Sequence, residues 1–308
     1  MDPVTKAVFA SWNWRPEVIL SLLLVGVLYG VGWWRLRRKR RRDRGVANGW
    51  RLTAYLAGLL LIALALLSPI EALAGQFFFM HMIQHLLLIM LAPPLLMLAN
   101  PLPFVLWGLP AGGRHIAGRG LSHVLHRESA FRRTLRTVTG PGIVWMVYVS
   151  LLVGWHDPNA YNLALTNQWV HDLEHFSFFL PSLAYWWLVV GAGPRIHKQT
   201  STPARMAFVV AAIPPTMLLG VSIAFATAPI YTYYLGVPRP WGLSVLQDQM
   251  LGGVIMWVPG SMMYIIATLI LAAGWLQTED RKPPLPIDQW STNETMAAPG
   301  IKVKGKSG

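Results

Sequence analysis

Two pairs of histidines head two of the apolar stretches in this sequence. The first pair stands in "HMIQH" (81–85) and the second in "HDLEH" (171–175). Within each pair the spacing of four residues places both imidazoles on one helix face, about 6 Å apart along the axis. Polar groups inside apolar helices need partners, and imidazole is a ligand for copper, zinc, iron and nickel. The pairs therefore predict one metal site, with the ligands His81, His85, His171 and His175.

The residues around the histidines narrow the choice of metal. The chain contains no cysteine, so a metal ion would have to be bound by His, Met, Asp, Glu or backbone oxygen. Thioethers favour Cu(I), and the absence of cysteine fits an oxidising compartment outside the cytoplasm. We expect copper, with zinc as an alternative that three imidazoles and Glu174 would also suit. The further candidate ligands are Met80, Met82, Asp248 and Met250.

Polar neighbours of the candidate ligands would orient the imidazoles. A metal-bound histidine usually donates its second ring N–H to a carboxylate or a carbonyl oxygen. Gln84 stands within the first pair, and Asp172 and Glu174 stand within the second. We expect these three side chains to fix the histidine tautomers. Binding a metal in this way requires no bond-making chemistry, so the sequence does not predict an enzyme.

Three other interpretations of the same residues stay open. The imidazoles could form a hydrogen-bonded cluster with a purely structural role. "HDLEH" also matches the H-x-x-E-H pattern of inverted zincin proteases, in which two histidines bind zinc and Glu174 would be the general base. Finally, one histidine from each pair could ligate a haem in an electron-transfer protein. An absorption spectrum separates the haem interpretation from the others.

The composition places these residues in a membrane protein. Of the 308 residues, 54% are hydrophobic and only 13% are charged, whereas soluble domains average about 25% charged residues. Several apolar stretches reach about 20 residues, the length that crosses a bilayer as a helix. The N-terminal segment lacks a basic region before its first apolar stretch, so we interpret that stretch as a membrane span and not as a cleaved signal peptide.

Seven transmembrane helices are predicted, with the N-terminus outside and the C-terminus in the cytoplasm. With this orientation, all but three of the 26 Lys and Arg residues lie in cytoplasmic segments, as the positive-inside rule requires. The net charge of +13 then reflects orientation and attraction to anionic lipids, and we do not expect nucleic-acid binding. The predicted spans are 16–34, 50–68, 77–98, 139–154, 169–190, 206–226 and 248–274.

The orientation also sets the depth of the candidate ligands. The third, fifth and seventh spans all enter the membrane from the outer side, so "HMIQH", "HDLEH" and "QDQML" (247–251) come to a similar level. We expect the transmembrane domain to cover 1–275, including a segment at 99–138 that lies as a helix on the cytoplasmic surface. The remaining tail, 276–308, has the composition of a disordered segment.

Three stretches together resemble the CtaG family of seven-helix assembly factors for caa-type cytochrome c oxidases. They are "HMIQHLLLIMLAPPLLML" (81–98), "NQWVHDLEHFSFF" (167–179) and "DQMLGGVIMWVPGSMMY" (248–264). The resemblance covers roughly residues 50–275. It does not extend to the single-span copper protein that has the same name in other bacteria.

The resemblance implies a multi-pass protein of the bacterial plasma membrane that helps a haem–copper oxidase to mature. We expect it to bind copper near the periplasmic face and to pass the ion to an oxidase subunit, as a chaperone does. Carried onto this sequence, the implied site consists of the two histidine pairs with Asp248 and Met250 as neighbours. The sequence leaves the oligomeric state and the oxidase centre that is served open.

Overall fold

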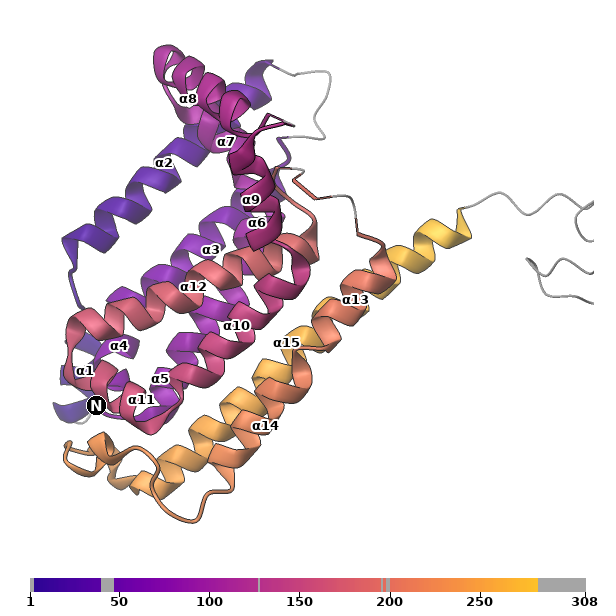
Figure 1. Cartoon of the computed structure of the whole chain (residues 1–308). Coiled ribbons are helices and arrows are strands. Elements are labelled where there is room, and N and C mark those ends of the chain that lie inside the picture. The colour runs from indigo at the N-terminus through magenta and orange to yellow at the C-terminus, as the bar shows by residue number, and fades with distance from the viewer. Residues whose placement is uncertain (1–2, 40–46, 127, 195, 198–199, 282–308) are drawn as a thin grey trace, which may run out of the picture.

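The computed structural model describes residues 3–39, 47–126, 128–194, 196–197 and 200–281. Within these residues every regular element is a helix, which confirms the all-α prediction (Figure 1). The elements are α1 (Pro3–Ala10), α2 (Pro16–Lys39), α3 (Gly49–Leu67), α4 (Pro69–Ala74), α5 (Phe78–Leu86), η1 (Leu87–Leu91), α6 (Ala92–Leu98), α7 (Pro101–Gly108), α8 (Ala111–Val124), α9 (Ala130–Val138), α10 (Pro141–Trp155), α11 (Pro158–Thr166), α12 (Gln168–Val190), α13 (Thr202–Val210), α14 (Ile213–Ala224), η2 (Thr232–Leu235), η3 (Pro240–Gly242) and α15 (Val245–Asp280).

The long helices form a bundle with its short helices at the two ends (Figure 1). Among the described residues, five helical segments are long and apolar enough to cross a membrane: α2, α3, α5–η1–α6, α13–α14 and α15. The pair α9 and α10, bent by 52°, would be a sixth. The protein is thus a multi-pass membrane protein. Helix α12 lies where the fifth span is predicted, but polar side chains in its first turns make it less apolar. The count of seven stays a prediction.

The third predicted span contains a π-helical turn, η1, immediately after the first histidine pair. Pro93 has no N–H, so it cannot donate to the carbonyl of Ile89 four residues earlier. The indole Nε1 of Trp186 on α12 donates to that carbonyl instead, at 3.0 Å. This bond ties α12 to the segment that follows "HMIQH", and it is one reason that the two histidine-bearing helices lie side by side.

Glycines set how closely helix α15 approaches its neighbours. A Cβ on Gly252 would lie 2.2 Å from the Phe78 ring at the start of α5. A Cβ on Gly253 would lie 2.4 Å from the backbone nitrogen of Ala224 in α14. Both distances are far inside van der Waals contact, so only glycine permits this packing, which is common between membrane helices. The close approach holds the N-terminal part of α15 against the helix with the first histidine pair.

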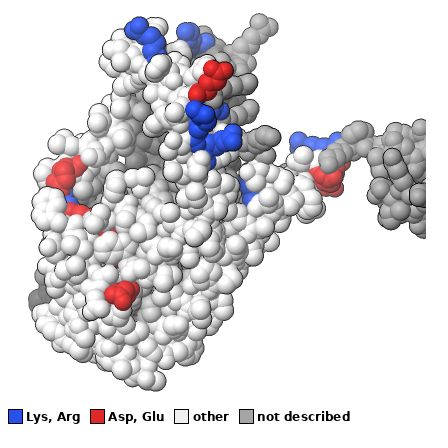
Figure 2. Space-filling view, viewed as in Figure 1, with Lys and Arg blue, Asp and Glu red and all other residues white. Residues whose placement is uncertain are grey.

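The two ends of the bundle differ in charge. In Figure 2 the Lys and Arg side chains gather over the end with α8 and α9, and the opposite end shows few. Helices α8 and α9 contain no buried residue, as expected for a surface segment. Helix α7, also within 99–138, differs from this prediction: it packs into α2, where a Cβ on Gly32 would lie 1.7 Å from the Phe104 carbonyl oxygen. The membrane orientation and the contact with anionic lipids stay predictions.

The last helix is longer than the predicted span. It continues to Asp280, so residues 276–280 of the predicted disordered tail are helical. Because the helix contains no breaker between 274 and 280, it extends past the apolar stretch. Residues 282–308 lie outside the described part of the chain.

Candidate metal centre

The structure brings the two histidine pairs together between α5 and α12. The ring centroids of His81 and His171 are 5.2 Å apart, and those of His85 and His175 are 5.4 Å apart. All four side chains are buried, and His81 has no exposed surface. The sequence predicts that these two segments, ninety residues apart, lie at one depth. In the structure their imidazoles are in direct contact.

Local signals start both helices just before the histidines. Asn167 is the N-cap of α12, and its side-chain oxygen accepts from the backbone N–H groups of Trp169 and Val170 at 3.0 and 3.4 Å. Helix α5 has no side-chain cap of its own at Phe77. Its first free N–H groups, those of Phe78 and Phe79, donate instead to the carboxylate of Asp248 on α15. The start of each helix fixes which face the four-residue spacing presents to the partner.

Two overlapping groups of ligand atoms lie at distances that suit one ion. The groups are His81, His171 and His175, and His81, His85 and Glu174; within each, the ligand atoms lie within 4.8 Å of one another. The Nε2 atoms of His81 and His85 are each 3.8 Å from an oxygen of Glu174. That separation exceeds a hydrogen bond. Two atoms bound at 2.0–2.1 Å to the same ion are about 3.3–4.2 Å apart, so the donor set fits a metal.

The ligand atoms also lack other partners. Among the described residues, no hydrogen bond reaches His81 Nε2, His171 Nε2, His175 Nε2, either nitrogen of His85 or either oxygen of Glu174. Each buried polar atom without a partner costs about 1–3 kcal/mol. Seven such atoms in one cluster would be a large penalty for a structural hydrogen-bonded cluster, whereas a bound cation would satisfy most of them.

A chain of tyrosine hydroxyls sets the tautomer of His81. Tyr234 donates its hydroxyl proton to the Ala74 carbonyl at 3.0 Å, since a carbonyl can only accept. The bond between Tyr161 and Tyr234, 3.1 Å, must then use the proton of Tyr161. The Tyr161 oxygen, 2.8 Å from His81 Nδ1, therefore accepts, and Nδ1 carries the proton. This leaves the lone pair of His81 on Nε2, the atom that faces Glu174.

Glu174 is itself a candidate ligand and does not merely orient one. Its side chain has no exposed surface, and it faces one histidine of the first pair with each oxygen. The sequence predicts that it orients a histidine and does not bind the metal itself. The i+3 spacing from His171 places Glu174 toward α5 instead, so it belongs to the candidate ligand set.

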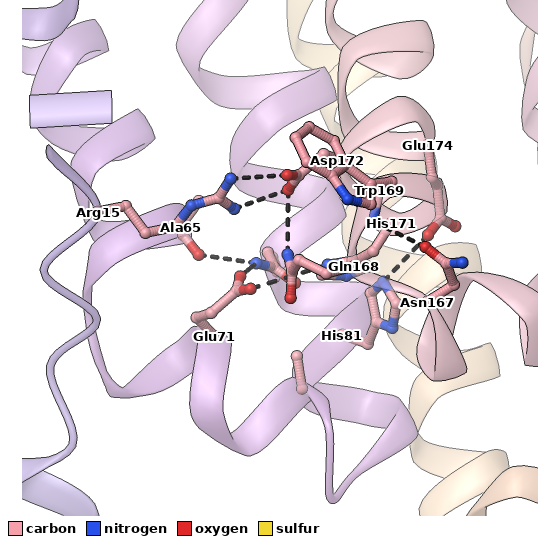
Figure 3. A network of polar contacts seen from close by, with 12 residues as sticks. Arg15, Ala65, Glu71, His81, Asn167, Gln168, Trp169, His171, Asp172 and Glu174 are labelled. Carbon is pink, nitrogen blue, oxygen red and sulfur yellow. Dashed lines mark hydrogen bonds and ion pairs between the residues drawn. The ribbon is translucent and has the colours of Figure 1, made fainter. Parts of the chain in front are cut away.

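Glu71 lies at the edge of the cluster toward α3 and α4 (Figure 3), and Gln84 binds to it there. Gln84 donates to the Ala65 carbonyl at 2.8 Å and also to the Glu71 carboxylate. Glu71 Oε1 in turn lies 3.8 Å from His171 Nδ1. Burial raises the pKa of Glu71 to about 7, and the hydrogen bond from Gln84 opposes part of that effect. Gln84 therefore reaches His171 through Glu71 and makes no direct bond to an imidazole.

Asp172 is directed away from the imidazoles. It accepts two hydrogen bonds of 2.7 Å from the guanidinium of Arg15, the residue just before α2 (Figure 3). The pairing with Asp172 raises the pKa of Arg15 above its usual value. Gln168 also donates to Asp172 at 3.1 Å. The expectation that Asp172 fixes a histidine tautomer is not met, because the i+1 position after His171 points to the neighbouring α2 side of the helix.

Asp248 lies outside the candidate ligand groups, which corrects its assignment as a ligand. Its carboxylate accepts from the backbone N–H groups of Phe78 and Phe79, both at 2.9 Å, and from Arg239 at 2.7 Å. Asp248 on α15 thus caps the N-terminus of α5, where a negative charge is favoured. Asp248 does lie beside the start of α5, but its role there is to position the helix of the first histidine pair.

The methionines differ in how close they lie to the four histidines. Met250 is 47% exposed on the outside of the bundle, so it cannot reach the cluster. Met82 is buried but lies beside Gly252 and His85, on a different face of α5 from His81. Met80 is half-buried at the start of α5. Of the thioethers that favoured Cu(I) in the sequence, that of Met82 is buried beside His85 and that of Met250 is turned away from the cluster.

The sequence matches the family model of the cytochrome c oxidase caa3 assembly factors over residues 27–278. The chain belongs to this family. The matched range includes both histidine pairs, Glu174 and the capping residue Asp248. The resemblance noted from the three sequence stretches is thus confirmed.

Similar curated proteins are longer than this chain. An uncharacterised protein of Mycobacterium leprae (strain TN) is 25% identical over 283 residues, which are 89% of this chain and 40% of that protein. Uncharacterised proteins of Mycobacterium bovis and Mycobacterium tuberculosis are each 24% identical over 286 residues. The chain spans about two fifths of the length of these relatives, 40% and 41%. No solved structure matches the chain.

Three further residues of this family member belong to the site but were not assigned to it from sequence. They are Tyr161, His156 and Glu71. Tyr161 and His156 both lie in "WHDPNAY" (155–161), a polar stretch between two apolar ones. The signal was present, because a histidine and a tyrosine beside a span at the same end of the bundle can reach the cluster. Their partners could not be chosen without the packing of α11 against α12.

Proposed function

We propose that this chain is an assembly factor that binds copper between α5 and α12 and passes it to a subunit of a haem–copper oxidase. The observation that carries the proposal is the set of buried imidazole and carboxylate atoms that lack partners and lie at the spacing of metal ligands. The family supplies the context of oxidase assembly. His81 belongs to both ligand groups and is therefore the central ligand of the proposed site.

The chain's own side chains do three things for the cargo ion. His81 presents Nε2 because the hydroxyl of Tyr161 holds its proton on Nδ1. Burial of the four imidazoles excludes water, so a bound ion would exchange only with ligands that the protein or a partner offers. Glu174 supplies a negative charge that offsets that of the cation. No bond of a substrate is broken, and the proposal does not include catalysis.

Copper is favoured over zinc by the context and not by the ligand groups. Three imidazoles and a carboxylate suit either ion, but copper is the metal that a cytochrome c oxidase needs besides haem. We infer that the protein acts in the bacterial plasma membrane with the metal site toward the periplasm. A single-cysteine labelling experiment tests this orientation, since the chain has no native cysteine. Asn159→Cys should react with an impermeant thiol reagent in intact cells, and Ser122→Cys should react only after permeabilisation.

A second candidate function is a zinc-dependent hydrolase. One observation favours it: His81 provides a third imidazole beside the His171 and His175 of "HDLEH", with Glu174 next to it. The burial of Glu174 disfavours it, because a peptide and its attacking water must reach the general base. Glu174→Gln decides between the two. A hydrolase would keep its zinc and lose all activity on a peptide substrate, whereas the proposed copper protein has no such activity to lose.

Metal analysis of the purified protein tests the proposal. The full chain is prepared in mild detergent, loaded anaerobically with Cu(I), freed of excess ion and analysed for copper and zinc. The wild type should retain copper. The double variant H81A/H85A should lose the copper bound between α5 and α12, and H123A/H126A at the other end of the bundle should match the wild type. A wild type that retains neither metal would leave the structural cluster as the better interpretation. A Soret band in the unloaded protein would favour haem.

A further inference from the structure

A small cavity adjoins the candidate metal centre on its inner side. It has a volume of about 50 Å³ and lies between α5, η1, α10, α14 and α15. Besides apolar side chains, its wall contains two imidazoles, three thioethers and one hydroxyl: His85, His156, Met82, Met90, Met256 and Thr216. Met90 follows His81 by nine residues along the third span, which corresponds to a helix rise of about 13 Å. The cavity therefore leads from the cluster toward the middle of the membrane.

Both histidines of this cavity have lone pairs without partners. The Nδ1 of His156 lies 2.6 Å from the Leu152 carbonyl, which can only accept, so the proton is on Nδ1 and the lone pair is on Nε2. That Nε2 has no partner among the described residues, and neither nitrogen of His85 has one. The two ring centroids are 6.4 Å apart, which leaves room for a small ligand between the rings. Two buried acceptors facing an apolar cavity favour a cation.

The thioethers identify the class of cation. Methionine sulfur is a soft and polarisable ligand that selects Cu(I) among biological metals. Of the three methionines, Met90 already accepts a hydrogen bond from the Tyr148 hydroxyl at 3.7 Å. Met82 and Met256 have no such bond among the described residues, so their sulfur atoms are free to bind an ion. Zinc and iron prefer imidazole, carboxylate or thiolate, and the cavity wall offers no carboxylate or thiolate.

We propose that this cavity is a second, inner Cu(I) site, formed by His85, His156 and a thioether of Met82 or Met256. The proposal rests on the proposed function, in which His81, shared by both ligand groups, is the central ligand of an outer site between α5 and α12. His85 is the link, because it belongs to the second outer ligand group and also lines the cavity. An outer ion can exchange its bond to His81 for bonds to His85 and then His156.

The transfer is a ligand exchange and involves no redox step. The ion stays Cu(I), each bond to nitrogen or oxygen that breaks is replaced by a bond to nitrogen or sulfur, and each neutral imidazole keeps its one proton. No electron acceptor or proton acceptor is needed. The outcome is an ion at a greater depth in the membrane, surrounded by softer ligands and farther from water.

Anaerobic titration with Cu(I) buffered by bicinchoninate, followed by X-ray absorption at the copper edge, tests the inner site. The wild type in detergent should bind two equivalents, and copper–sulfur scattering should appear with the second. The variant M82L/M90L/M256L should bind one equivalent without sulfur scattering. His156→Ala should lose the same equivalent. The control M250L/M262L, which changes two exposed methionines of α15, should bind two equivalents with sulfur.

The possible outcomes separate the two proposals. Copper bound to the wild type with nitrogen and oxygen scattering alone would overturn the inner site and leave the outer one standing. The same holds if the triple methionine variant keeps both equivalents. A wild type that binds no Cu(I) contradicts the proposed function and the inner site together. Because Leu and Met have similar volumes, the core should tolerate the exchange, and the wild-type spectrum decides even if the variant does not fold.

Discussion

Eight of the nine histidines of this protein fall into two sets at opposite ends of the bundle. At one end, the rings of His81, His85, His156, His171 and His175 are buried and most of their nitrogens lack hydrogen bonds. At the other end, His115, His123 and His126 are exposed on or just after α8. The residue type is the same, but one set faces other imidazoles and the other set faces solvent. The difference arises from the packing around each helix.

Helix pairing explains the contrast. The faces of α5 and α12 that contain the histidines pack against each other, so each imidazole removes water from the next. Helix α8 buries none of its residues, so its histidines stay hydrated whatever their spacing. Imidazoles in water are poor indicators of function, whereas imidazoles that are buried without partners require a ligand. Four substitutions test this explanation of the difference between the two sets.

Removal of the central ligand should have the largest effect. His81→Ala removes the imidazole that both ligand groups share. A change of a residue that only orients a ligand lowers metal affinity about 10- to 100-fold, so the affinity for Cu(I) should fall by more than that. His115→Ala is the matched control and should leave the affinity unchanged. Competition with a chromophoric Cu(I) chelator measures both. Equal affinities for the two variants would mean that the buried cluster is not the copper site.

The cap on α5 should affect stability next. Asp248→Ala leaves Arg239 and two backbone N–H groups without their buried partner, which should lower the free energy of unfolding by about 3–5 kcal/mol. Asp280→Ala, at the exposed end of the same helix, should change it by less than about 0.5 kcal/mol. Denaturant unfolding in detergent, followed by tryptophan fluorescence, provides the comparison. A small effect of Asp248→Ala would show that α5 begins correctly without its cap from α15.

The hydroxyl that sets the His81 tautomer should have a smaller effect on binding. Tyr161→Phe removes the acceptor for the Nδ1 proton of His81, and the affinity for Cu(I) should fall about 10- to 100-fold. Tyr233→Phe, whose hydroxyl makes no hydrogen bond to the cluster, is the control. The protein should stay folded in both variants, as circular dichroism would show. An unchanged affinity in Tyr161→Phe would mean that His81 presents Nε2 without help.

The ion pair between Arg15 and Asp172 should have the smallest effect on stability. The side chains of Arg15 and Asp172 are 19% and 29% exposed, and such pairs contribute about 0.2–1 kcal/mol. Asp172→Asn should therefore lower the free energy of unfolding by no more than that, less so at high salt, with no change in copper affinity. Unfolding and chelator competition on one preparation give both values. A loss of copper would mean that Asp172 acts on His171 after all.

Much of the site could be predicted because it depends on spacing. The four-residue intervals of "HMIQH" and "HDLEH" place the imidazoles on one face of each helix. The charge distribution predicts that both helices enter the membrane at the same side. The roles of Glu174, Asp172 and Asp248 could not be predicted, because each depends on a neighbouring helix that sequence spacing does not identify. Asp248 was expected to bind metal and instead caps α5, 170 residues away in sequence.

The sequence by itself determined the class of molecule: an apolar helical membrane protein of the caa3 assembly-factor family, with its histidines on two spans. Composition and periodicity suffice for this, since hydrocarbon permits few other structures. Only the tertiary structure decided which of the polar residues meet. In it, Glu174 lies among the imidazoles and Asp172 binds Arg15. The segment "HMIQHLLLIML" lines a cavity whose wall includes three thioethers. Those outcomes depend on how α5, α12 and α15 rotate about their axes, and that rotation is set by packing between helices far apart in the chain.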